Sequence, residues 1–194
     1  MNLNFYSDPT ERALVTELMD WSKVALEKPS VHFNGFPPCP FAKAAWLDNK
    51  VSVIFKKEDS YQTLYSCISQ YDDTFDLIII VDLKNTKNPE DFHEYLDTLN
   101  DKISEGMFID KDIWLMGFNP EDEPSDFVAD VTFNYEVDDE YSLIFVQRLS
   151  KLQESANKLD KKGYYDSYKE EYNSLEIYQN RENLYRRLKD GNET

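Results

Sequence analysis

Residues 76–82 read DLIIIVD, and this stretch decides the fold of the chain. Its apolar run, from Leu77 to Val81, is rich in β-branched side chains and lies between two aspartates. That length and composition are typical of a buried strand rather than a helix. The stretch therefore predicts a central strand of a sheet, and the segments around it must supply the helices that flank that sheet.

Segments of helical periodicity alternate with further strands on both sides of this one. Leu64 and Ile68 recur one turn apart, and the pair Asn88-Pro89 opens a second amphipathic segment with a helix-start signal. The predicted helices and strands fall, in chain order, at residues 8–28, 41–47, 51–55, 60–70, 76–82, 88–103 and 113–118. This order favours an α/β fold with a small, mostly parallel sheet of three or four strands, joined by right-handed crossovers and flanked by helices.

The chain beyond the third predicted strand adds further elements. We predict a fourth strand over residues 127–137 and a helix that begins at Tyr141 and that Gly163 ends. The Tyr-rich segment 166–189 is also helical in pattern. It either forms an arm that meets a partner or packs on the domain, and packing is favoured because most of the stability of a helix comes from packing of its amphipathic face. We expect a single α/β domain, residues 1–158, with a helical C-terminal extension, residues 159–194.

The charge of the chain is strongly negative and unevenly distributed. Lys and Arg number 21 and Asp and Glu 38, for a net charge of −17 at pH 7, whereas residues 148–194 alone hold 10 basic and 9 acidic residues. Residues 112–147 contain ten carboxylates and no Lys or Arg. A surface of this sign repels phosphate backbones and anionic lipid, so we expect neither direct nucleic-acid binding nor membrane binding.

The acidic segment 112–147 has three interpretations that the sequence leaves open. It forms a solvated face, it holds a cation, or it belongs to an interaction protein that docks on a basic protein partner or mimics the charge of a nucleic acid. The small size of the chain and its bias toward Asp, Asn, Lys and Tyr fit a phage-encoded interaction protein of the last kind.

Several common functional signals are missing from the sequence. No segment approaches the roughly 20 apolar residues of a membrane span, and the first residues do not resemble a signal peptide. Two cysteines make no disulfide framework, so we expect a cytoplasmic protein. Nucleotide-binding glycine motifs and the GxSxG motif do not occur, and His32, Cys39, Cys67 and His93 lack the spacing of a zinc site. We therefore expect no cofactor and no metal.

Residues 35–43, GFPPCPFAK, are the strongest candidate for a functional site. Pro40 suits the first position of a helix, which places Cys39 at or beside the N-cap, where free N–H groups and the helix dipole lower the pKa of a thiol. Lys43 adds a positive charge one turn later, and His32 is a candidate to contact the thiol or a substrate. The opposing interpretation is that the prolines form a rigid connector around a cysteine that packs as a small apolar side chain.

A second group of candidates lies in the loop NPEDEPSD, residues 119–126. Asn119 and Asp122 follow the carboxyl end of a predicted strand, which is the edge at which ligands bind in open α/β sheets. We predict that these two residues and His32 bind substrate. The alternative is an ordinary solvated loop, because no EF-hand spacing is present.

The candidate segment and the stretches that follow it resemble a known family. GFPPCPFAKAAW with the strand VSVIF after it resembles the CPFAK signature of the bacterial domain-of-unknown-function 1415 family. The stretches DLIIIVD, PEDFHEYLDTLNDKI, IWLMGFNPED and YSLIFVQRLSKL keep the order of that family's later elements, over roughly residues 10–155. The resemblance implies a small α/β protein and, since the family has no assigned reaction, no particular activity. Cys39, Lys43 and Arg148 match its pattern and are our candidate catalytic residues for a thiol-centred or small-ligand site.

The chain departs from the family's pattern at three places. FNP at residues 118–120 stands where the pattern has Phe-His-Pro, FVQR at residues 145–148 stands where it has His-Leu-Leu-Arg, and a loop of the Asn-Arg-Ser-Pro-Tyr-Pro type is missing. The histidines that would be candidate bases or ligands are therefore not here. If the family is enzymatic, the resemblance implies that this chain has lost or altered the activity.

Overall fold

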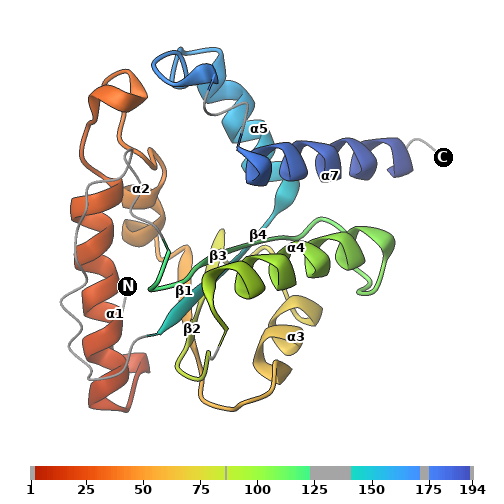
Figure 1. The fold of residues 1–194 in the computed structure, drawn as a ribbon. Helices are drawn as coiled ribbons and strands as arrows, with labels where there is room; N and C mark the ends of the chain where they lie inside the picture. The colour runs from red at the N-terminus through yellow and green to blue at the C-terminus, as the bar shows by residue number, and fades with distance from the viewer. Residues whose placement is uncertain (1–2, 86, 123–140, 171–174, 193–194) are drawn as a thin grey trace.

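The core of the protein is a four-stranded mixed sheet (Figure 1). A computed structural model describes residues 3–85, 87–122, 141–170 and 175–192. The strands are β1 (Val51–Lys56), β2 (Leu77–Asp82), β3 (Trp114–Phe118) and β4 (Ser142–Gln147). Their order is β1-β2-β4-β3, with β1 parallel to β2 and β4 antiparallel to both of its neighbours. The predicted α/β class is confirmed, whereas the prediction of a mostly parallel sheet is wrong, because β4 inserts between β2 and β3.

β4 occupies a segment for which the sequence pattern predicts a helix. The helix predicted from Tyr141 begins only at Leu149. The apolar residues on either side of this boundary happen to match a helical spacing, but three of those before it, Ile144, Phe145 and Val146, are β-branched or aromatic and suit a strand. Leu143, Ile144 and Val146 are all fully buried, as expected for a central strand that is covered on both faces. The fourth strand predicted over residues 127–137 lies outside the described residues.

Helices lie on both faces of the sheet, and their starts follow local signals. The helices are α1 (Pro9–Trp21), α2 (Ala42–Leu47), α3 (Gln62–Ser69), α4 (Pro89–Glu105), α5 (Leu149–Asp160) and α7 (Glu176–Asn192), with 3-10 turns at Leu3–Phe5 and Val31–Phe33 and a π-helical turn at Ser22–Leu26. The side chain of Asp8 accepts a hydrogen bond from the Thr10 N–H at 2.9 Å, and that of Asn88 accepts one from the Asp91 N–H at 2.9 Å. Both caps precede a proline in the first turn, as the start signals predict. Among the described residues, no helix is long and apolar enough to span a membrane.

α3 and α4 pack on one face of the sheet. Side chains from both helices form a single buried cluster with β2, β3 and β4. α4 approaches β3 closely, since a Cβ atom added to Gly117 would lie 2.4 Å from Leu96 Cδ1 and 2.4 Å from Phe92 Cε1. The Asn100 side chain binds the outer edge of β3, donating to the Leu115 carbonyl at 2.9 Å and accepting from its N–H at 2.8 Å. The two buried backbone groups at that edge are therefore satisfied.

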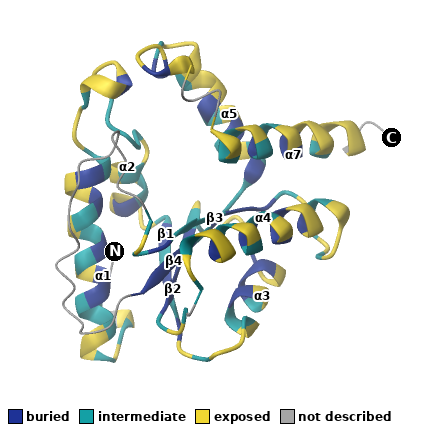
Figure 2. Ribbon diagram, in the orientation of Figure 1, coloured by how far each residue is buried: buried dark blue, intermediate teal, exposed yellow. Residues whose placement is uncertain are grey.

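The other face of the sheet is covered in two parts. α1 and α2 pack on β1 and β2, with Leu18 and Trp46 in their buried cluster. On the opposite side Trp114 of β3 packs with Leu149 of α5 and Leu184 of α7. Figure 1 shows these two parts apart, with α1 and α2 on the left and α5 and α7 on the right, and Figure 2 shows that the helices of both parts carry buried as well as exposed residues. α7 contacts α4 and α5, so the C-terminal helix packs on the domain.

An aromatic cluster joins these two parts at one end. The ring of Phe33, in the segment before α2, lies 5.0 Å from the ring of Tyr164 and 5.2 Å from that of Tyr168, both in the segment after α5. Tyr165 belongs to the same buried cluster. The hydroxyl of Tyr164 donates to the carbonyl of Pro38. The N-terminal irregular segment is thus held against the turn that follows α5.

Lys56 and Asp82 end two neighbouring parallel strands and form a buried ion pair. Lys56 Nζ lies 2.9 Å from Asp82 Oδ1, and the two side chains are 1% and 0% exposed. Lys56 also donates to the Glu58 carbonyl at 2.9 Å and lies 5.0 Å from the centre of the Tyr61 ring. The Lys84 N–H donates to Asp82 Oδ1 at 2.9 Å, whereas Asp82 Oδ2 has no hydrogen-bond partner among the described residues. Both members of the pair are therefore buried, and the hydrogen-bonding capacity of Asp82 is only partly satisfied by the described residues.

Candidate functional site, a cleft beside Cys39

The backbone around Cys39 is fixed by a few hydrogen bonds and by its prolines. The Cys39 N–H donates to the Leu26 carbonyl at 3.0 Å, and the Cys39 carbonyl accepts from the Ala42 N–H at 3.2 Å. α2 begins at Ala42 and its N-cap is Phe41. Cys39 therefore lies two residues before the cap of a six-residue helix and does not occupy the cap itself. Pro40 belongs to the turn that leads into the helix.

Burial raises the pKa of the Cys39 thiol above its ordinary value. The N–H groups of Phe41 and Ala42 act in the opposite direction, and the Glu27 carboxylate adds to the rise. The prediction of a lowered pKa is wrong, because the N–H groups that it invokes are present but burial outweighs them. The raised pKa disfavours the thiolate that nucleophilic chemistry requires.

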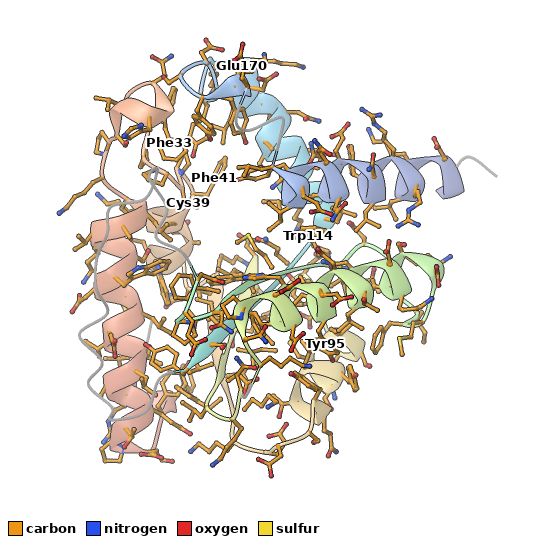
Figure 3. All side chains as sticks on the ribbon, viewed as in Figure 1. Phe33, Cys39, Phe41, Tyr95, Trp114 and Glu170 are labelled. Carbon is orange, nitrogen blue, oxygen red and sulfur yellow. The ribbon has the colours of Figure 1, made fainter. Side chains whose placement is uncertain are left out.

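A cleft of about 390 Å³ opens beside Cys39, between the two parts that cover the second face of the sheet. Its floor includes Leu77 and Ile79 of β2 and Phe145 of β4. The wall on the N-terminal side is apolar and largely aromatic, and its side chains are Leu18, Trp21, Leu26, Phe41, Ala42 and Trp46. Figure 3 shows Cys39 and Phe41 in the space between α2 and α5. Sulfur and aromatic rings thus line the same side of the cleft.

The opposite wall is a mostly polar stripe along α5. Lys151, Leu152, Ser155 and Lys158 recur at spacings of three and four residues, so they share one face of the helix, and all four line the cleft. Glu154 lines it as well. The two long walls therefore differ in character: the N-terminal one is apolar, whereas that of α5 carries charges of both signs with lysines in excess.

Arg148 closes one end of the cleft and is held by two carboxylates. Its Nε lies 3.2 Å from Asp73 Oδ1, and its guanidinium also contacts the carboxylate of Asp110. The guanidinium carbon lies 4.8 Å from the centre of the Tyr71 ring, and the side chain is 12% exposed. With two anionic partners and a stacked ring, Arg148 fixes the junction between β4 and α5 rather than offering a free charge.

The structure brings together only some of the residues predicted from sequence. Cys39 and Arg148 both line the cleft, whereas Lys43 is exposed on α2 and does not line it. His32 is exposed in a 3-10 turn and lies outside the cleft. The cleft opens where β1 and β2 begin, at the amino end of the parallel pair. That is the edge opposite to the one at which the predicted loop leaves β3.

Asn119 and Asp122 lie at that other edge and are occupied mainly with each other. Asp122 Oδ2 accepts from the Asn119 N–H at 2.7 Å, and the Asn119 amide donates to the Lys87 carbonyl at 3.1 Å. Asp122 Oδ1 lies 2.8 Å from His93 Nε2, a hydrogen bond that raises the pKa of His93. Asn119 also lines a separate cavity of about 290 Å³. These contacts organise the turn after β3, and they do not converge with Cys39.

Most of the residues that line the cleft could not be predicted from the sequence. Trp21 and Leu26 fall in a helix whose apolar face predicts packing only, and Lys151 and Lys158 look like ordinary solvated lysines. The one available signal is the charge balance of the sequence, which changes from strongly acidic to even at residue 148, close to the start of α5. In the described parts of the chain, no three His, Cys, Asp or Glu side chains gather in a way that would hold a metal ion.

The fold and the cleft define a small α/β protein with a mixed sheet and a lateral apolar cleft. No family model matches the chain, and no curated protein or solved structure matches it. The resemblance to the domain-of-unknown-function 1415 family therefore stays a prediction. The function has to be inferred from the geometry and chemistry of the cleft.

Proposed function

We propose that the protein binds a small, largely apolar molecule in the cleft beside Cys39. The cleft itself carries this proposal: it measures about 390 Å³, with an apolar floor, one aromatic wall and a few polar groups opposite. Pockets for small ligands in proteins have this size and this composition. The π-helical turn Ser22–Leu26 contributes to its wall, and such turns are frequent at functional sites.

The chemistry of the lining favours binding over thiol catalysis. Burial raises the pKa of the Cys39 thiol, and neither histidine lines the cleft to act as its base. Arg148 is already paired with carboxylates. We therefore assign Cys39 to the apolar wall. Both cysteines are free, which fits the reducing cytoplasm that we propose as the location of the protein.

A series of linear alcohols of increasing chain length tests the proposal. Trp21 and Trp46 line the cleft whereas Trp114 is buried elsewhere, so tryptophan fluorescence reports on its occupancy. Burying one methylene group contributes about 0.8 kcal/mol, which predicts an affinity that rises about fourfold per added methylene until the cleft is full. Affinities that do not depend on chain length would contradict binding in an apolar cleft.

A matched pair of variants on α2 controls for binding elsewhere. Ala42 lines the cleft and Ala44, two residues along the same short helix, is exposed to solvent. Ala42→Trp should fill part of the cleft and weaken octanol binding at least tenfold, whereas Ala44→Trp should leave the affinity unchanged. Circular dichroism checks that both variants are folded. Equal binding by the two variants would place the alcohol outside the cleft.

We propose docking on a basic protein partner as the alternative function. Five acidic side chains on α4, those of Glu90, Asp91, Glu94, Asp101 and Glu105, are exposed in a chain of net charge −17. Half of the acidic segment 112–147, with seven of its ten carboxylates, lies outside the described residues. Binding of a purified basic protein should be strong at low salt and lost at about 1 M salt, where the screening length falls to about 3 Å. The absence of binding at low salt would exclude this alternative.

A further inference from the structure

We infer that the ligand of the cleft is an amphipathic anion, with an apolar chain or ring and a carboxylate head group. This inference rests on the proposed binding function and specifies its ligand class. The difference between the two long walls of the cleft carries it. The wall from α1 and α2 offers apolar and aromatic side chains and no cation, whereas the wall from α5 offers Lys151, Ser155 and Lys158.

The charges along the α5 wall are not equally available to a ligand. Arg148 is paired with Asp73 and a second carboxylate, and Lys151 Nζ lies 3.2 Å from Asp73 and 4.0 Å from Asp76. Lys158, two turns beyond Lys151 on the same stripe, forms no ion pair with any residue in the described ranges. Among the three cations that line the cleft, Lys158 is therefore the one that is not already paired with a carboxylate of the described residues.

Neutral donors line the same cleft as this lysine. Ser155 precedes Lys158 by three residues, so the two side chains are neighbours on the helix surface. The side chains of Ser155 and of Gln147, at the end of β4, both line the cleft and make no hydrogen bond with any described residue. A carboxylate near Lys158 would thus find a charged donor and a hydroxyl donor, while its apolar part lies against Trp21 and Trp46.

Two carboxylates also line the cleft and would repel a bound anion. Substitutions of the lining can therefore be predicted either to weaken or to strengthen the binding of an anion. Asp76 is near Lys151, which offsets it, while Glu154 lies on α5 one turn before Lys158 and forms no ion pair with any described residue. Removing Lys158 should weaken the binding of an anion, and removing the charge of Glu154 should strengthen it. Neither change should affect a neutral ligand of the same shape.

Isothermal titration calorimetry with octanoate, octanol and octylammonium separates the contribution of the head group to the affinity from that of the apolar chain, because the three compounds differ mainly in the head group. At low salt we expect octanoate to bind most tightly and octylammonium most weakly. Lys158→Met should weaken octanoate binding about threefold, the effect of one solvent-exposed ion pair, and Glu154→Gln should tighten it to a similar extent. The exposed Lys162, which does not line the cleft, supplies the control variant Lys162→Met.

The outcomes distinguish this inference from the function on which it rests. Octanoate binding that exceeds octanol binding, and that loses this advantage in Lys158→Met and at high salt, supports an anionic ligand. Equal affinities for the three head groups, or equal effects of Lys158→Met and Lys162→Met, overturn the anionic class and leave the apolar cleft in place. If none of the three compounds binds, the proposed function fails and the inference fails with it.

Discussion

Replacing Lys56 by methionine should destabilise the protein severely, although methionine keeps an unbranched, flexible side chain at the site. The substitution removes the charge that lies 2.9 Å from Asp82 Oδ1 at the end of the β1–β2 pair. Asp82 is fully buried, and its Oδ2 atom already lacks a hydrogen-bond partner among the described residues. After the substitution, the Asp82 carboxylate keeps one hydrogen-bond donor among the described residues, the N–H of Lys84.

The magnitude follows from the burial of both partners. Breaking a buried ion pair from one side costs about 3–5 kcal/mol, because an uncompensated charge is left in the interior. Lys56→Met should therefore lose this amount of unfolding free energy. The double variant Lys56→Met/Asp82→Leu leaves no buried charge, and its remaining cost is the lost hydrogen bonds to the Glu58 carbonyl and the Lys84 N–H, about 1 kcal/mol each.

Urea denaturation of the wild type, both single variants and the double variant measures the coupling between the two residues. We expect a double variant within about 2 kcal/mol of the wild type and a coupling energy of about 2 kcal/mol or more, with unchanged dependence on urea. The reasoning is refuted if Lys56→Met costs less than about 1 kcal/mol, or if the double variant costs as much as the sum of the single variants.

Three further predictions concern separate parts of the structure. Gly117→Ala should lower the unfolding free energy measured in urea by about 1–3 kcal/mol, because its Cβ would overlap side chains of α4. The control Gly191→Ala, whose added Cβ would approach no packed neighbour within 4 Å, should change it by less than about 1 kcal/mol. Equal losses in the two variants would contradict the close packing of α4 on β3. The alkylation rate of Cys39 should rise with pH around a midpoint above the ordinary thiol value of about 8.5, because burial raises its pKa; a lower midpoint would contradict this. NMR titration should show a pKa of His93 above 6.5 that falls toward 6.5 in Asp122→Asn. Since the folded pKa is the higher one, the stability that this contact adds should be complete below pH 6.5 and be lost as the pH rises through the folded pKa; identical titrations of wild type and variant would count against the contact.

The elements that local chemistry determines are predictable from the sequence. The helix starts at Asp8-Pro9 and Asn88-Pro89 depend on a cap and a proline within a few residues, and both are present in the structure. The strand DLIIIVD depends on an apolar run of strand length. Residues 142–147 are different, because their spacing fits either a helix or a strand. Their burial between β2 and β3 decides between the two, and no local signal encodes that position.

The pKa of Cys39 shows the same limit at the level of a single side chain. The N–H groups of Phe41 and Ala42 are close in sequence, so their effect on the sulfur can be anticipated. Burial instead depends on how distant parts of the chain pack around this segment, where the neighbouring Pro38 carbonyl accepts a hydrogen bond from Tyr164, 126 positions away. The distant contribution is larger, and it reverses the expected direction of the pKa shift.

The antiparallel course of β4 explains both the wrong prediction of a mostly parallel sheet and the position of the cleft. Because β4 runs antiparallel to β2, it ends at the edge where β1 and β2 begin. α5 starts immediately after β4, at Leu149, and packs toward Trp114 and α7 rather than across β2. The sheet surface at Ile79 and Phe145 is consequently left as the floor of the cleft, with α1 and α2 on its other side. A parallel fourth strand would have ended at the opposite edge, next to Asn119, where the second group of candidate residues lies.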